Sequence, residues 1–236
     1  MLKVRVKFKK FGAMRFIGHL DVMRYFQKAM IRADIPIAFS GGFSPHQIMS
    51  FANPLGVGVT SDGEYFDIEL QSPISSERAV KQLNEKMVEG MEVVSFLQIA
   101  EEKKKTGMAI VAGADYLATV KSGAFPEDWK EKTATFMNQE QILIVKKTKR
   151  SEKEVDIKPM IYKFEVRDDS IYMQVATGSV ENLKPGLVME AFCNYLGVDT
   201  ESVAFANHRL DLYANIGEGE TRELVTLESL GKVIED

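Results

Sequence analysis

The stretch Leu2–Lys10 alternates between apolar and cationic residues as far as Lys9, and this alternation limits the possible folds more than any other feature of the chain. A period of two is typical of a β-strand that buries one face. The other face is predicted to carry a row of four cations: Lys3, Arg5, Lys7 and Lys9. Their spacing of about 6.5 to 7 Å is close to that of nucleic-acid phosphates. A solvated face of an antiparallel sheet has the same pattern, so both interpretations stay open.

Positive charge is concentrated in residues 1–50, which hold nine lysines and arginines against two acids, a net charge of +7. The rest of the chain holds 21 basic and 32 acidic residues, a net charge of −11. A second basic run covers residues 146–163. This segregation favours a polyanion-binding surface with an acidic back, although strands and helices with solvated charge give a similar pattern.

Composition excludes several classes of protein. With 236 residues, 45% of them hydrophobic, the chain can bury a sizeable core in one or two domains. It has no apolar run of the roughly 20 residues that cross a membrane and no signal-peptide pattern, so a cytoplasmic location is expected. Its single cysteine, Cys193, lies in an apolar helical pattern and is expected to be a buried thiol. One cysteine cannot hold an iron–sulfur cluster.

A helix is predicted to begin at His19 or Asp21 and to end near Ala33, before Ile35-Pro36. Apolar residues recur through it at helical spacing. On the opposite side, a basic stripe is formed at i+4 spacing by Arg24, Lys28 and Arg32.

The order of elements predicts an α+β fold of two tandem ferredoxin-like (βαββαβ) units with antiparallel sheets. Residues 1–100 form the basic N-terminal unit, and a charged connector follows. Residues 107–215 form the C-terminal unit, and residues 216–236 form an acidic, loosely held tail. The open sheet face of such folds often binds RNA, which here is an argument by analogy alone.

Side chains that could bind a ligand or take part in a reaction are concentrated in the basic N-terminal unit: Arg15, His19, Asp21, Arg24, Ser44 and His46. They could bind a phosphate, a base or a partner protein, or the two histidines could simply cap a helix and order a turn. No compact metal-ligand spacing exists, and a Ser44–His46 nucleophile pair lacks a GxSxG elbow, so no metal site is expected and no catalytic residue is assigned. The glycines of residues 53–58 match neither a dinucleotide site nor a P-loop. Asp156 and Lys158 are either a surface pair or ligand contacts.

Several motifs in family order resemble one bacterial family, the radical-SAM-linked domain of unknown function. They are RFIGHLD at 15–21, FSGGFSPH at 39–46, SFA at 50–52, LGVG at 55–58, EYFD at 64–67, EVDIKP at 154–159 and LKP at 183–185. The departures are Gln47, where the family often has proline, and lysines where arginine is common in the last two motifs.

The resemblance implies a radical SAM partner protein that carries the iron–sulfur cluster and S-adenosylmethionine, since this chain lacks the cysteines. It also implies work related to RNA. The leading hypothesis is a non-catalytic RNA-binding or substrate-presenting subunit of a radical SAM modification enzyme. Phosphate contacts are then expected from the basic residues Lys3, Arg5, Lys7, Arg15, Arg24 and Lys28. A metal-independent ribonuclease that uses His19 or His46 is one alternative, and a protein–protein adaptor without RNA contact is another.

Overall fold

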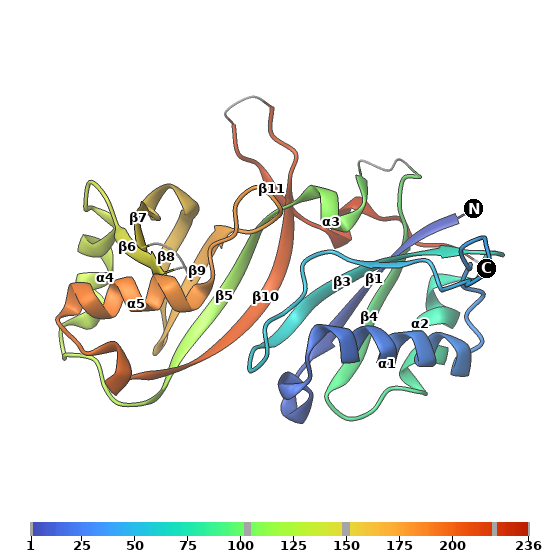
Figure 1. Cartoon of the computed structure of the whole chain (residues 1–236), viewed down its shortest axis with the longest axis horizontal. Helices are drawn as coiled ribbons and strands as arrows, with labels where there is room; N and C mark the ends of the chain where they lie inside the picture. Colours follow the sequence, from blue (N-terminus) through green and yellow to red (C-terminus); the bar gives the residue numbers. More distant parts are fainter. Residues whose placement is uncertain (1, 102–104, 148–151, 219–220, 236) are drawn as a thin grey trace. The chain divides into compact units, whose positions relative to one another are not determined.

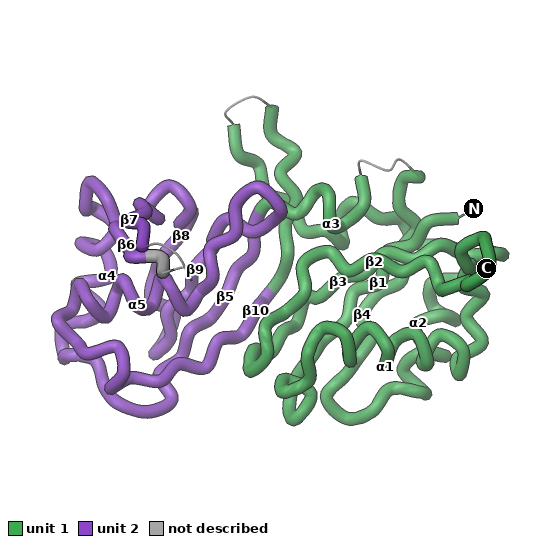
Figure 2. Tube along the Cα trace, in the orientation of Figure 1, with its two compact units in different colours: residues 1–112, 211–236 green, residues 113–210 purple. Residues whose placement is uncertain are grey.

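The computed structural model describes the whole chain except residues 1, 102–104, 148–151, 219–220 and 236. It is a mixed α+β protein whose strands pair largely antiparallel, which confirms the predicted class (Figure 1). The chain divides into two compact units (Figure 2). Residues 1–112 and 211–236 form unit 1, and residues 113–210 form unit 2. No helix in the described part of the chain has the length and apolar character needed to cross a bilayer.

Unit 1 is built on strand β1, which pairs antiparallel with β3 on one side and β4 on the other. A short strand, β2, pairs antiparallel with β3. The elements up to the connection with unit 2 are β1 (Leu2–Lys10), a 3-10 turn (Gly12–Phe16), α1 (His19–Arg32), β2 (Met49–Phe51), β3 (Thr60–Leu70), α2 (Ser76–Asn84), β4 (Met91–Gln98), α3 (Gly107–Ile110) and the start of β5 (Val111–Ser122). The unit is completed by the end of β10 (Ala204–Asn215), by β11 (Leu224–Thr226) and by a 3-10 turn (Glu228–Leu230).

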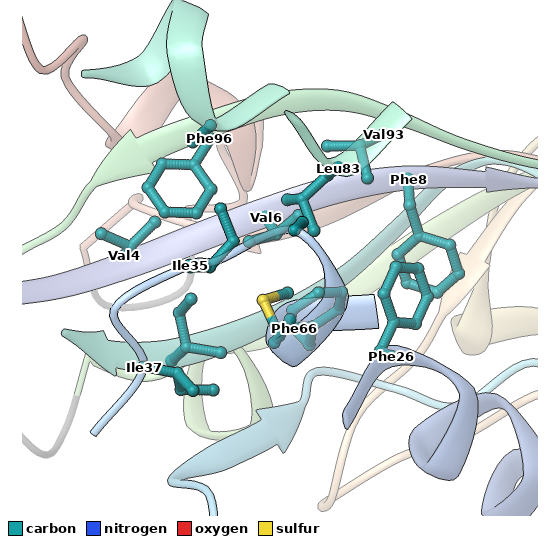
Figure 3. Packing of buried hydrophobic residues seen from close by; sticks show 14 of the residues in the cluster. Val4, Val6, Phe8, Phe26, Ile35, Ile37, Phe66, Leu83, Val93 and Phe96 are labelled. Atoms are coloured by element: carbon teal, nitrogen blue, oxygen red, sulfur yellow. The ribbon is translucent and has the colours of Figure 1, made fainter. Parts of the chain in front are cut away.

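The apolar side of β1 lies in a core that α1 and α2 cover, as the alternation predicts (Figure 3). Phe8 of β1 packs edge-on against Phe26 of α1, with ring centroids 4.6 Å apart. Leu83 of α2 and Phe66 of β3 are fully buried in the same cluster. These contacts fix α1 on the sheet by its apolar face.

The opposite side of β1 is also covered: Arg5 is buried, and Lys3, Lys7 and Lys9 are half-buried. The expected outer row of four cations is therefore not open to solvent along its length. Arg5 is only 2% exposed. Leu227 has no exposed surface, and its carbonyl accepts a hydrogen bond from Arg5 Nη1 at 3.2 Å. The segment after β10 is therefore not a loose tail. It pairs with β10 through β11 and hydrogen-bonds Gln98 of β4 through Lys232.

Unit 2 has the strand order β10-β5-β9-β8, with a separate β6–β7 hairpin. Its elements after β5 are α4 (Trp129–Met137), β6 (Leu143–Lys147), β7 (Glu152–Asp156), a 3-10 turn (Lys158–Met160), β8 (Ile161–Arg167), β9 (Ser170–Ala176), α5 (Pro185–Leu196), a 3-10 turn (Thr200–Ser202) and the start of β10. Phe136, Phe164 and Phe192 form an aromatic core, with ring centroids 5.0 to 5.2 Å apart. Cys193 is buried beside Phe192, as predicted, and burial raises the pKa of its thiol.

The unit boundaries differ from those that the sequence suggests. The charged connector was expected to separate two units at residues 101–106, yet unit 1 continues to residue 112 and resumes at residue 211. The physical reason is that the C-terminal segment supplies the cover for the polar side of β1, so it belongs to the first unit.

Candidate functional site

The cations of α1 lie on its solvent side, as the helical spacing predicts. Arg24, Lys28 and Arg32 are all exposed. Their neighbour Asp21 contacts Arg24 with 3.5 Å between carboxylate Oδ1 and Nη1, and both side chains are about two-thirds exposed. Such a surface pair contributes about 0 to 1 kcal/mol, so it leaves Arg24 available to a ligand.

Apolar side chains lie beside these cations on the exposed side of α1 and in the turn before it. Leu20 and Ile31 on α1 are exposed, and so is Phe16. The guanidinium of Arg15, which is half-buried, lies 4.6 Å from the centroid of the Phe16 ring. The region therefore offers an aromatic face next to a positive charge.

The turn that presents Arg15 and Phe16 is anchored by a glycine. Phe11 N–H donates to the Gly90 carbonyl at 2.9 Å. Gly90 has φ +94°, and a Cβ there would come within 2.7 Å of the Phe11 carbonyl oxygen. A second link joins Gly58 N–H to the Arg15 carbonyl at 2.8 Å, which holds the glycine-rich loop against the turn.

His19 begins α1, and its ring packs edge-on against Phe51 at 5.0 Å between centroids. Burial lowers the pKa of His19. Nearby, the buried Lys10 donates from Nζ to the Ile17 carbonyl at 2.8 Å. Burial lowers the pKa of Lys10, while the charge of the buried Glu64 opposes that shift.

These side chains line a cavity of about 10 Å³, which is the size of one water molecule. Its walls are Phe8, Lys10, His19, Val22, Phe51, Pro54, Leu55 and Glu64. The cavity is too small for a substrate. The sequence did not single out Lys10 and Glu64, although a second lysine directly after Lys9 does break the alternation of the strand.

His46 is bonded to Ser40, not to Ser44 as the proposed nucleophile pair required. The distance from Ser40 Oγ to His46 Nδ1 is 2.9 Å, and His46 N–H also donates to Ser40 Oγ at 3.1 Å. Ser40 N–H donates to the His46 carbonyl at 2.8 Å. These bonds close residues 40–46 into a compact loop, on which Ser44 and His46 are both exposed.

The loop carries Phe43 fully in solvent, beside Gly42, whose φ of +98° suits glycine. At its far end the buried Gln47 donates from Nε2 to the Gln27 carbonyl of α1 at 2.9 Å. This bond fixes the loop on the helix that carries the basic stripe.

Asp156 and Lys158 are engaged within unit 2, so they are not in the same unit as the other candidates. Asp156 Oδ1 accepts from the N–H of Ile142 at 2.9 Å and from that of Lys158 at 3.0 Å. Lys158 Nζ donates to the Gln139 carbonyl. Asp156 thus joins the start of β6 to the end of β7. In the described part of the chain, no bond joins the side chains of Asp156 and Lys158.

The cations of β1 form ion pairs with carboxylates. Arg5 makes a two-point ion pair with Asp67, with Nε to Oδ1 at 2.8 Å and Nη2 to Oδ2 at 3.0 Å. Lys7 Nζ donates to Asp211 at 2.9 Å and to Glu228 at 2.8 Å. Lys3 lies 3.8 Å from Glu69. Of the six basic residues expected to contact phosphate, Arg24 and Lys28 are exposed and Arg15 is half-buried. The other three pair with carboxylates of β3, β10 and the C-terminal segment: Lys3, Arg5 and Lys7.

Replacing Glu228 by glutamine is expected to destabilise unit 1 at pH 7, with a difference from wild type that shrinks as the pH falls. Burial raises the pKa of Glu228, but hydrogen bonds from Lys7 and Ser95 outweigh burial and leave the pKa lowered. A carboxyl whose folded pKa is depressed stabilises above its unfolded pKa of about 4.3 and loses that effect as the pH falls through the folded value. Urea unfolding at pH 7, 5, 4 and 3 measures the difference.

The matched control is Glu223→Gln in the same segment, where the carboxylate is exposed. A Glu228→Gln difference that stayed constant from pH 7 to pH 3 would contradict the assignment.

In the described part of the chain, no three His, Cys, Asp or Glu side chains are placed to hold a metal ion. A family model described as an uncharacterised protein conserved in bacteria, DUF2344, matches residues 3–185. Comparison with curated proteins gives no match. Among solved structures, a chain in the "Crystal Structure of a Cbf5-Nop10-Gar1 Complex" is similar at 12% identity and a TM-score of 0.45. The match covers 89% of this chain and 48% of that chain, about half its length, and is too distant to assign a fold or a function.

Proposed function

The chain belongs to the bacterial DUF2344 family, and from this premise we propose that it is a non-catalytic RNA-binding subunit that presents RNA to a modification enzyme. One observation carries the proposal: exposed cations and exposed aromatic rings share the α1 region of unit 1. Proteins that bind single-stranded nucleic acid combine a positive surface for the backbone with aromatic side chains on which bases stack.

The cations of α1 are the phosphate-binding residues of this proposal. Arg24, Lys28 and Arg32 follow each other at i+4, about 6 Å apart along the helix axis. Arg15 adds a fourth positive charge before the helix. Phe16 and Phe43 offer exposed rings for stacking. The remaining candidates are His19, Asp21, Ser44 and His46, and they would contact a base, a ribose or the partner protein.

The partner in this proposal is a radical SAM protein that supplies the iron–sulfur cluster and S-adenosylmethionine. Its support is the resemblance of the motifs between residues 15 and 185 to the radical-SAM-linked family. We also propose that each unit is ferredoxin-like. The support is that unit 1 pairs its strands as β4-β1-β3-β2 and unit 2 as β10-β5-β9-β8, the same order of equivalent strands.

Reversing the three charges of α1 is expected to weaken RNA binding at least a hundredfold at low salt. The variant is Arg24→Glu/Lys28→Glu/Arg32→Glu, and the probe is a fluorescently labelled single-stranded RNA of mixed sequence at 50 and 200 mM salt. Wild-type affinity should fall steeply between these salt concentrations, because bound phosphates release counterions. In the variant both the affinity and its dependence on salt should be lost. Phe43→Ala should weaken binding roughly tenfold, as expected for the loss of one stacked base.

The matched control reverses three charges beside α2: Arg78→Glu/Lys81→Glu/Lys86→Glu, all at exposed positions. Equal losses of RNA affinity in the two triple variants would show that the net charge of the protein, and not a site on α1, is responsible for binding. Salt-insensitive binding to a radical SAM partner without RNA binding would favour the adaptor. Cleavage of the RNA in the presence of EDTA, lost in His46→Ala, would overturn the non-catalytic assignment and favour the ribonuclease.

A further inference from the structure

A cavity of about 430 Å³ lies in unit 1. Small-molecule sites in proteins typically measure about 300 to 1,000 Å³, and they have mostly apolar walls with a few placed polar groups. The described lining of this cavity has that composition. Its polar side chains include Arg5 and Asn215, and its aliphatic ones are Ile99, Ala100, Ile110, Ala214, Ile216 and Leu230. The RNA surface proposed above uses none of these described residues.

Arg5 brings a buried hydrogen-bond donor to the cavity wall. An arginine side chain has five N–H groups. Four of them are used: Nε and Nη2 donate to Asp67, Nη2 also donates to the Lys105 carbonyl at 3.2 Å, and Nη1 donates to the Leu227 carbonyl at 3.2 Å. In the described part of the chain, no atom accepts the fifth N–H, which is on Nη1. A buried donor without an acceptor is unfavourable, so a molecule that offers an acceptor in the cavity gains a bond there.

The charge of Arg5 is already balanced inside the protein. The carboxylate of Asp67 is buried and lies 2.8 Å from Nε and 3.0 Å from Nη2. A second carboxylate at the same guanidinium would lose its own hydration and would be repelled by the charge of Asp67. The spare N–H of Arg5 therefore suits a neutral acceptor, such as a carbonyl oxygen, better than an anion.

Asn215 adds a second donor to the wall. Its Oδ1 accepts from the N–H of Gly217 at 3.1 Å and from that of Glu223 at 2.8 Å, which leaves Nδ2 as the part of the amide that can bond a ligand. Arg5 and Asn215 thus both offer hydrogen atoms to the cavity, which favours a ligand with a hydrogen-bond acceptor.

We infer that this cavity binds a small neutral molecule with an apolar body and a carbonyl group, such as a ketone, an ester or an amide. The carbonyl oxygen accepts the spare N–H of Arg5, and the apolar body lies against Ile99, Ile110 and Leu230. Lys105 contributes its backbone carbonyl to Arg5, and its exposed side chain has no role in this recognition. The binding is non-covalent, and it is separate from the RNA binding proposed above.

Ligand-observed NMR of the full chain can compare acetophenone, ethylbenzene and phenylacetate, which have the same number of carbon atoms. Acetophenone carries a neutral carbonyl, ethylbenzene has no acceptor, and phenylacetate is an anion. Acetophenone is expected to bind about fivefold more tightly than ethylbenzene, as for one added hydrogen bond, and also more tightly than phenylacetate. The guanidinium nitrogen resonances of Arg5 should shift with acetophenone and stay in place with ethylbenzene.

Substitutions that fill the cavity test its location. Leu230→Trp acts from a position that is 39% exposed, and it should weaken acetophenone binding at least tenfold. Ile216→Trp, from a position that is 49% exposed, should do the same and serves as the second variant if Leu230→Trp is unstable. The matched control is Val180→Trp in unit 2, which is 96% exposed and should leave the affinity unchanged. Circular dichroism identifies the variants that are folded.

Absence of acetophenone binding at millimolar concentration would overturn the inference. Equal affinity for ethylbenzene would overturn the hydrogen bond to Arg5, and tighter binding of phenylacetate would overturn the neutral class. Unchanged binding in a folded Leu230→Trp or Ile216→Trp variant would overturn the location.

Discussion

Replacing Asp67 by alanine is expected to lower the free energy of unfolding of unit 1 by about 3 to 5 kcal/mol, because it leaves Arg5 charged and buried without its partner. The carboxylate of Asp67 accepts two bonds from Arg5 and a third from the N–H of Gly107 at 2.7 Å. Hydrogen exchange of the β1 and β3 amides is the suitable measurement. The single tryptophan, Trp129, lies in unit 2 and reports on that unit instead.

The same strand offers a control two residues away. Glu69 faces Lys3 at 3.8 Å in a partly exposed pair, and Glu69→Ala should change stability by about 0 to 1 kcal/mol. The double variant Arg5→Met/Asp67→Leu should recover most of the loss, because an apolar pair removes the unpaired charge. If Asp67→Ala destabilised unit 1 no more than Glu69→Ala, the buried ion pair would not be the reason for the burial of Arg5.

Leu227→Ala is expected to destabilise unit 1 by about 2 to 5 kcal/mol, the range for a fully buried leucine. The substitution leaves the backbone carbonyl that Arg5 contacts in place, so the effect measures the packing of the C-terminal segment. Urea unfolding followed by far-ultraviolet circular dichroism gives the overall change, and hydrogen exchange of the β11 amides localises it.

Leu230→Ala, three residues later in the same segment, removes a side chain that is 39% exposed. It should lower stability much less, by about 1 kcal/mol or below. Equal effects of the two substitutions would mean that the segment is bound loosely along its whole length, as the acidic composition of residues 216–236 first suggests.

Periodicity predicted the parts of the fold that depend on local sequence. The apolar positions of Leu2–Lys10 do face the core, and α1 begins at His19 and ends at Arg32, close to the predicted bounds. Its cations are exposed because the apolar face of α1 is fixed by Phe26 and its neighbours. In these elements burial on one side decides the structure of the whole element.

The fate of the β1 cations was not predictable in the same way. Arg5 meets Asp67 across 62 positions of sequence, and Lys7 meets Glu228 across 221 positions. Alternation shows that a strand has two different faces, but it does not show whether water or another segment covers the polar one. Two-sided burial of a charged face requires partners that only the tertiary fold brings together.

In the candidate site, too, the sequence predicted the local structure but not the side-chain partners. The motif of residues 39–46 predicted a turn, and the structure has one, but Ser40 rather than Ser44 bonds the His46 ring. Asp156 was an ambiguous carboxylate in the sequence, and the structure places it in a hairpin as an acceptor for two backbone N–H groups. Which of several nearby side chains closes a loop depends on backbone geometry that spacing alone does not define.

The interrupted construction of unit 1 has a consequence for how the nascent chain matures on the ribosome. The helix-covered core draws almost entirely on residues 4–96, so that side can form early in synthesis. The polar side of β1 waits for residues 211–236, which emerge only after all of unit 2 has been translated. Until then the side chains of Arg5 and Lys7 stay hydrated on this side of β1, and only the helix-covered face of the sheet is packed. Synthesis that stops between residues 210 and 227 therefore releases a chain with a complete unit 2 and a half-covered unit 1, which makes the far C-terminus the sensitive point for quality control of the N-terminal strands.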